Sequence, residues 1–83
     1  MHYYVYLVKC SDDSLYCGYT NNLEKRINDH NNSNEGAKYT KSRRPVKLVY
    51  FEQVKNKNEA LKREDEIKKL PKEEKVNLIM VQQ

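Results

Sequence analysis

The chain has 83 residues, 37% of them hydrophobic, so it can bury one small core, and we expect a single domain over residues 1–83. Sixteen Lys and Arg against twelve Asp and Glu give a net charge of +4, which favours nucleic acid as the partner. The sequence shows no signal peptide and no apolar stretch of membrane-spanning length, which argues against a membrane protein and predicts a cytoplasmic location.

The first segment predicts a β-hairpin. Residues 3–9 and 15–20 are rich in aromatic and β-branched side chains, and four polar residues lie between them. Five of the seven tyrosines fall here, which fits packing or, in a protein that binds without cleaving, a platform for stacking bases. Tyr6 and Tyr16 share a face of the hairpin only if the loop has an odd number of residues or a bulge, because a one-residue slip exchanges the faces.

A helix is expected after the hairpin. Asn21 or Asn22 can cap a helix over residues 23–30, and the polar run 31–36 ends it. Arg26 and His30 lie one turn apart on this helix, beside its apolar positions, so both can reach the sheet edge. The alternative is a snorkelling arginine and an ordinary surface histidine.

The most cationic segment follows this helix. We expect residues 38–47 to be irregular, and they include no acidic residue. Such a segment predicts contacts with the phosphates of a nucleic acid. The candidate binding residues are Lys38, Lys41, Arg43 and Arg44.

The second half of the chain predicts one strand and two helices. Residues 46–54 read as a third strand, long enough to be central in the sheet. Asn56 or Asn58 then begins a helix over residues 59–70, and Pro71 is expected to be the first residue of a last helix. The order β-β-α-β-α-α predicts an α+β fold in which helices cover a small three-stranded antiparallel or mixed sheet.

Glu64 does not fit a solvent-exposed helix face. On a helical wheel it falls within the apolar stripe of Ile67, Ala60 and Leu61, between Ala60 and Leu61, whereas its acidic neighbours fall outside the stripe. Because burial of an unpaired carboxylate is unfavourable, Glu64 is either paired with a cation or used as a metal ligand or catalytic acid.

The two cysteines, Cys10 and Cys17, lack a C-x-x-C spacing. We interpret them as thiols that pack as small apolar side chains in a reducing compartment. Zinc binding together with His2 and His30 is the weaker interpretation, because the spacing of these four residues is irregular.

The order of several residues resembles the signature of the GIY-YIG nucleases. The matching segments are Tyr4-Val5-Tyr6, Tyr16-Cys17-Gly18, Glu24-Lys25-Arg26 with His30, and Glu64. The departures from the signature are Tyr4 for the first glycine, Val5 and Cys17 for the isoleucines, and Tyr19 for a lysine of some relatives. Residues 35–40 and 60–64 are similar to the small stand-alone bacterial members, and the resemblance covers residues 3 to about 70.

This resemblance implies a GIY-YIG-like fold and hydrolysis of phosphodiester bonds in DNA, with DNA favoured over RNA and a structure-specific role in repair or recombination. Family members use one divalent metal ion, so Glu64 would be the ligand of Mg²⁺ or Mn²⁺. Arg26 would bind the phosphate, since a guanidinium matches two of its oxygens. Tyr6 or Tyr16 would activate water, and His30 would assist proton transfer.

Two other functions fit the same sequence. The first is a non-catalytic module that binds nucleic acid through residues 38–47. The second is a domain that keeps the site and is recruited by a partner protein, because so small a nuclease has little surface with which to read sequence.

Overall fold

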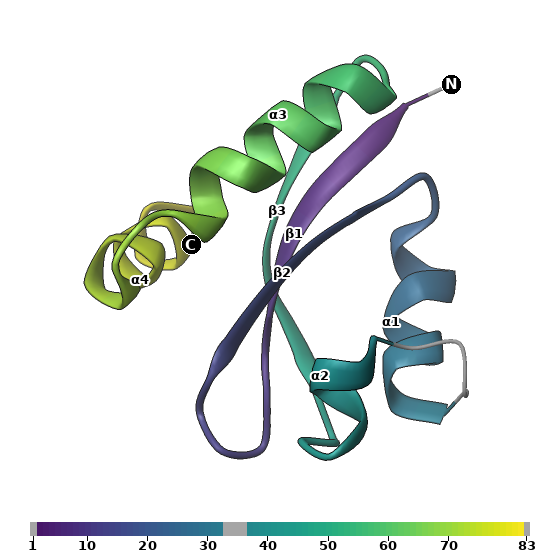
Figure 1. The fold of residues 1–83 in the computed structure, drawn as a ribbon, viewed down its shortest axis with the longest axis vertical. Helices are drawn as coiled ribbons and strands as arrows, with labels where there is room; N and C mark the ends of the chain where they lie inside the picture. The colour runs from purple at the N-terminus through teal and green to yellow at the C-terminus, as the bar shows by residue number, and fades with distance from the viewer. Residues whose placement is uncertain (1, 33–36, 83) are drawn as a thin grey trace.

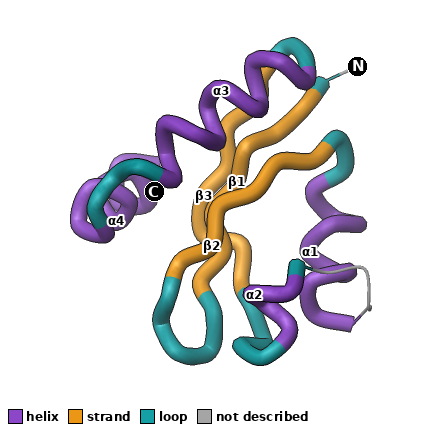
Figure 2. Tube along the Cα trace, viewed as in Figure 1, coloured by secondary structure: helices purple, strands orange, loops and turns teal. Residues whose placement is uncertain are grey.

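A computed structural model of the chain describes residues 2–32 and 37–82, which form a three-stranded antiparallel sheet with helices on both faces (Figures 1 and 2). The elements are β1 (Tyr3–Lys9), β2 (Leu15–Thr20), α1 (Leu23–Asn32), α2 (Lys38–Lys41), β3 (Lys47–Val54), α3 (Lys57–Lys68) and α4 (Lys72–Gln82). The predicted α+β class is confirmed, and the sheet is antiparallel throughout.

The central strand of the sheet is β1, because the strand order is β2-β1-β3. The expectation that the third strand is central was wrong. Length alone does not distinguish an edge strand from a central one, and β3 carries the marks of an edge. A register shift interrupts its pairing with β1, and the side-chain amide of Gln82 hydrogen-bonds both the backbone N–H and the C=O of Phe51.

Both faces of β1 are buried, which explains why helices cover the sheet on two sides. Val5 and Leu7 point to one face and Tyr6 and Val8 to the other, and all four are at most 1% exposed. Val5 and Leu7 pack in a cluster with α3, and Tyr6 and Val8 pack against α1 and the start of β3. Figure 1 shows α3 on one side of the strands and α1 and α2 on the other.

The helix after the hairpin begins as predicted but ends later. Asn22 is the cap, since its side chain accepts a hydrogen bond from the backbone of Lys25. The helix continues to Asn32 because Asn31, expected to end it, uses its side-chain amide to pair with the backbone N–H and C=O of Val46. Arg44 donates to the carbonyls of Asp29 and His30 and so satisfies the last turn.

The remaining helices also differ from the predicted ones. The segment expected to be irregular contains α2, a single turn that is stabilised by hydrogen bonds from Thr40 and Lys41 to the Ala37 carbonyl. Asn56, one of the two predicted caps, accepts from Glu59, so α3 starts two residues earlier than expected and also ends earlier, at Lys68. Pro71 precedes α4 and provides its first carbonyl acceptor, rather than its first helical residue.

Candidate active site

The hairpin brings Tyr6 and Tyr16 to the same face of the sheet. The cross-strand pairs are Tyr6 with Gly18 and Val8 with Tyr16, so the two tyrosines lie diagonally across neighbouring strands. Five residues separate the last strand pair, so the loop has the odd number of residues that the shared face requires. Asp13 allows this loop by adopting a φ of 66°, one of the few residue types that tolerates such a conformation.

Gly18 is needed because the ring of Tyr6 occupies the space above it. A Cβ atom at this position would lie 2.4 Å from Tyr6 Oη and 2.7 Å from its Cζ. Any larger side chain would therefore displace the phenol. The last glycine of the second tripeptide thus has a packing role that fixes the first tyrosine.

Tyr6 and His30 form the buried centre of the site. The Tyr6 hydroxyl lies 2.7 Å from His30 Nε2, and the two side chains are 1% and 0% exposed. Burial raises the pKa of Tyr6 to about 12, against the opposing effect of the hydrogen-bonding Arg26 guanidinium. Burial likewise lowers the pKa of His30 to about 4, helped by the positive charge of Arg26, so the imidazole is neutral at neutral pH. The surface-histidine alternative is wrong for His30.

Tyr16 is half-buried and held by two rings. Its ring meets His30 edge-on at a centroid distance of 5.5 Å and stacks on Tyr39 of α2 at 5.7 Å. The guanidinium carbon of Arg43 lies 3.9 Å from the Tyr39 ring centroid, and Arg43 also forms an ion pair with Asp12 of the hairpin loop. Tyr16 is therefore fixed in place while remaining partly open to solvent.

Arg26 lies at the rim of this assembly. It lines a pocket of about 310 Å³ at the junction of β2 and α1, together with Thr20, Asn22 and Lys25. Asp29 also lines the pocket, and its Oδ2 atom forms an ion pair with Lys25 Nζ at 3.0 Å. The structure thus gathers four of the predicted catalytic residues, Tyr6, Tyr16, Arg26 and His30.

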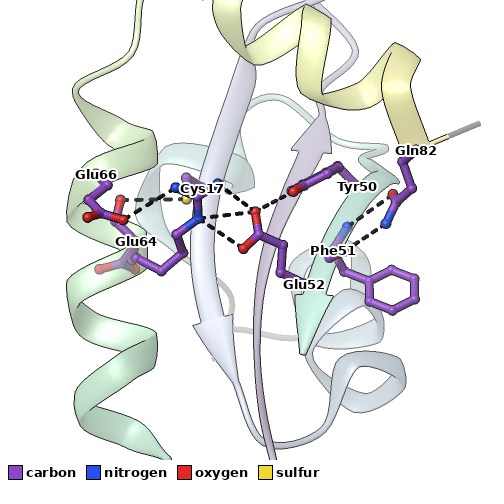
Figure 3. Close-up of polar contacts among 8 residues, drawn as sticks. Cys17, Tyr50, Phe51, Glu52, Glu64, Glu66 and Gln82 are labelled. Atoms are coloured by element: carbon purple, nitrogen blue, oxygen red, sulfur yellow. Dashed lines mark hydrogen bonds and ion pairs between the residues drawn. The ribbon is translucent and has the colours of Figure 1, made fainter. Parts of the chain in front are cut away.

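Glu64 comes from the opposite layer of the fold. Its side chain is only 16% exposed, compared with 65% for Asp65, as the helical wheel predicts. The Glu64 backbone carbonyl accepts from the thiol of Cys17, which lies on β2 between Tyr16 and Gly18 (Figure 3). Glu64 therefore lies beside β2, an edge strand of the sheet, on the face opposite Tyr6 and Tyr16.

The donors around Glu64 can be tested against the ion that the family implies. Within residues 2–32 and 37–82, no three His, Cys, Asp or Glu side chains gather as a metal-binding group. Glu64 offers one carboxylate, which forms a long ion pair of 3.7 Å with Lys68. One carboxylate fits a hard cation such as Mg²⁺, which keeps several waters and takes other oxygens from a substrate phosphate.

The four predicted nucleic-acid-binding residues fall into two pairs. Lys38 and Lys41 are exposed on α2. Arg43 and Arg44 are half-buried and hold parts of the fold together: Arg43 binds Asp12 and Arg44 caps α1. The two cysteines are buried in separate clusters on opposite faces of the sheet, which fits a packing role.

Comparison with known proteins places the chain in a family. The family model of the GIY-YIG catalytic domain matches residues 2–77. The chain belongs to the GIY-YIG family. This domain is a nuclease domain, which implies a nucleic acid as substrate. None of the helices in the described ranges is long and apolar enough to cross a membrane.

Relatives of this GIY-YIG protein include small proteins named UPF0213. One from Clostridium perfringens is 63% identical over 76 residues, which cover 92% of this chain and 81% of the relative. One from Haloquadratum walsbyi is 52% identical over 77 residues, which cover 93% of this chain and 85% of the relative. The solution NMR structure of a UPF0213 protein from Bacillus halodurans matches with a TM-score of 0.62 at 41% sequence identity. The solution NMR structure of a protein from E. faecalis matches with a TM-score of 0.66 at 38% identity. Each match covers 98% of this chain and 85% of the solved chain.

Sequence reasoning missed the contribution of α2 to the site. Tyr39 stacks on Tyr16, and Thr40 lies 2.9 Å from His30 Nδ1 and is fully buried. Both residues fall in a segment that was expected to be an irregular binding loop. The only signal was the similarity of residues 35–40 to small GIY-YIG proteins, which carried no role for either side chain.

Proposed function

We propose that this chain is a divalent-metal-dependent endonuclease that hydrolyses phosphodiester bonds in DNA, acts on particular DNA structures in repair or recombination, and works in the cytoplasm. The supporting observation is the convergence of Tyr6, Tyr16 and His30 beside Arg26 on one face of the sheet of a GIY-YIG domain. Rings and buried hydrogen bonds hold these side chains in place, as a preorganised site requires.

In this proposal Arg26 binds the scissile phosphate. Its guanidinium lines an open pocket and can present two N–H donors to phosphate oxygens. Positive charge at this point stabilises the extra negative charge that develops on the phosphate oxygens in the transition state. Lys25 lines the same pocket but is paired there with Asp29, so Arg26 accounts for the net positive charge of the pocket lining.

The two tyrosines have different access to a reacting water. Tyr6 is 1% exposed and its hydroxyl is already hydrogen-bonded to His30, so it cannot contact a water from bulk solvent. Tyr16 is half-buried, and its ring is fixed by Tyr39. We assign contact with the attacking water to Tyr16, and to Tyr6 and His30 the task of holding Arg26 and Tyr16 in position.

Glu64 is the residue that would hold the metal. A single Mg²⁺ or Mn²⁺ ion, when bound, would supply positive charge for the phosphate and lower the pKa of a water. The half-buried position of Glu64, next to β2, keeps its carboxylate in a fixed place at low cost in side-chain entropy. Lys38 and Lys41, both exposed, are proposed to contact the DNA backbone outside the site.

The decisive experiment compares Glu64→Ala with the neighbouring Asp65→Ala variant. Purified protein is incubated with branched, nicked and single-stranded DNA, and with matched RNA, in Mg²⁺, Mn²⁺ or EDTA. We expect metal-dependent cleavage of DNA by the unchanged protein and by Asp65→Ala, and a loss of at least about 100-fold in Glu64→Ala. The stability of both variants should change little, because each loses an i,i+4 ion pair with a lysine that is at least half exposed.

Two results would overturn the proposal. Cleavage that persists in Glu64→Ala would remove Glu64 from the mechanism. Salt-sensitive DNA binding by the unchanged protein, with no cleavage in any divalent metal, would instead support the non-catalytic binding module.

A further inference from the structure

Three polar side chains form a continuous, fully buried chain of hydrogen bonds behind the candidate site. Tyr6 Oη lies 2.7 Å from His30 Nε2, and His30 Nδ1 lies 2.9 Å from Thr40 Oγ1. Thr40 Oγ1 in turn donates to the backbone carbonyl of Ala37 at 2.8 Å. All three side chains are at most 1% exposed, so water does not compete for the two contacts that join them.

The direction of every hydrogen bond in this chain follows from the last one. A carbonyl oxygen can only accept, so the single hydroxyl proton of Thr40 is used for Ala37. Thr40 Oγ1 can then only accept from His30, and the imidazole proton must be on Nδ1. A neutral imidazole carries one proton, which leaves Nε2 as an acceptor for the hydroxyl proton of Tyr6.

The charge state of the histidine agrees with this assignment. Burial and the nearby Arg26 lower the pKa of His30 to about 4, so the ring is neutral at neutral pH. The Tyr6 hydroxyl donates a hydrogen bond to Nε2, so the lone pairs of its oxygen can accept from the Arg26 guanidinium. This contact lowers the pKa of the phenol, although the larger effect of burial raises it. One tautomer therefore aligns Tyr6 with Arg26.

We propose that Thr40 is a positioning residue, whose hydroxyl holds His30 in the Nδ1-protonated tautomer and thereby aims the Tyr6 hydroxyl proton at Nε2 and its oxygen at Arg26. Thr40 lies on α2 between Lys38 and Lys41, so the basic turn is tied directly to the buried centre of the site. The effect on cleavage rests on the proposed nuclease function, whereas the tautomer does not depend on it.

The experiment measures the histidine tautomer by ¹⁵N–¹H NMR of the side chains at neutral pH. The chain has two histidines, and the exposed His2 serves as an internal reference. We expect His30 in the unchanged protein to be a single tautomer protonated at Nδ1. Thr40→Ser, which keeps the hydroxyl, should retain this spectrum, whereas Thr40→Val, of similar shape without it, should lose the single tautomer.

Cleavage kinetics give a second measurement. Thr40→Ser should keep a kcat within about threefold of the unchanged protein, and Thr40→Val should lower kcat by on the order of 10-fold or more with little change in KM. A His30 protonated at Nε2, or the same single tautomer in Thr40→Val, would overturn the proposal. If Thr40→Val does not fold, the tautomers of the unchanged protein and of Thr40→Ser still decide. Absence of cleavage together with the expected spectra would refute the nuclease function and leave the positioning role intact.

Discussion

On the face of the sheet covered by α1 and α2, Tyr6, His30 and Thr40 are fully buried and hydrogen-bonded to one another. On the face covered by α3 and α4, the buried side chains include Val5, Leu7 and Ile67, and the charged groups lie at the rim. There Arg63 makes a two-pronged contact with Glu52. Glu52 also accepts a hydrogen bond from the Tyr50 hydroxyl (Figure 3). The face with Tyr6, His30 and Thr40, the polar face, is held by directional hydrogen bonds. The face with Val5, Leu7 and Ile67, the apolar face, is held mainly by apolar packing.

This difference shows how one small sheet can serve two purposes. A buried polar network is stable only when every group is satisfied, so it specifies one arrangement of the side chains. Apolar packing tolerates small shifts, and ion pairs at a half-exposed rim contribute little free energy. We therefore expect the geometry of the site to depend on the first face and the attachment of the Glu64 helix on the second.

Gly18→Ala should have the largest effect, because it disturbs the polar face directly. The new Cβ would lie 2.4 Å from Tyr6 Oη, so the ring must move and the hydrogen bond to His30 must lengthen or break. We expect a loss of about 4 kcal/mol in the free energy of unfolding, from overpacking together with a weakened buried hydrogen bond. Urea unfolding measures the loss, and histidine NMR reports the change at His30.

Cys17→Ala is the matched control on the same strand. Cys17 directly precedes Gly18, but its side chain points to the other face of the sheet, where it is 4% exposed in an apolar cluster. Its truncation should cost only about 1 kcal/mol and leave the His30 signals in place. Equal losses in the two variants, or an unchanged His30 signal in Gly18→Ala, would show that the two faces do not differ as described.

The two faces also differ in how much of them the sequence predicts. The apolar face follows from simple patterns: the aromatic and β-branched side chains of β1, and the helical stripe of Ala60 and Ile67 that contains Glu64. These patterns predict burial because burial depends mainly on the period of apolar residues. The shared face of Tyr6 and Tyr16 is predicted only as a condition on the length of the loop.

The contacts of the polar face could not be predicted from the periodicity of the sequence. Thr40 and Tyr39 are polar residues in a basic segment, and nothing in their spacing indicates burial or stacking. Their contacts depend on where α2 lies relative to α1, which is set by long-range bonds such as that of Asn31 to Val46. The edge position of β3 likewise depends on pairing partners rather than on the composition of the strand.

Acid should weaken the polar face before the apolar one. The pKa of His30 is lowered from 6.5 to about 4, so the unfolded chain takes up a proton at a higher pH than the folded one. Its contribution is complete above about pH 6.5 and is lost as the pH falls toward 4, by up to about 3 kcal/mol. The other groups that face His30 are Tyr6, Tyr16, Arg26, Asp29, Thr40 and Arg44.

Urea unfolding at several pH values isolates this contribution. His30→Gln should be less stable at pH 7 but should lack the decline in stability between pH 6.5 and 4.5. His2→Gln, which changes an exposed histidine, should keep that decline. The same decline in all three proteins would assign it to other groups.

The smallest effect is expected from the ion pair on the apolar face. Partial burial raises the pKa of the Glu52 carboxyl, but the hydrogen bonds from Arg63 and Tyr50 and the charge of Arg63 outweigh it and hold the pKa below its usual value. This contribution is present above about pH 4.5 and is lost at lower pH, a window below that of His30. The Glu52 side chain is 24% exposed and that of Arg63 is 34% exposed, so screening by solvent limits the coupling energy between their charges.

A double-mutant cycle with Glu52→Gln and Arg63→Met measures this coupling. We expect about 1 kcal/mol at pH 7 and a smaller value in acid below the lowered pKa of Glu52, where its carboxylate takes up a proton. Because Arg63 precedes Glu64 on α3, Arg63→Met should also alter the dependence of cleavage on metal concentration, without changing the His30 tautomer. A coupling above about 3 kcal/mol would place a strong directional interaction on the face that packing is expected to dominate, and a changed tautomer would show that the two faces are not independent.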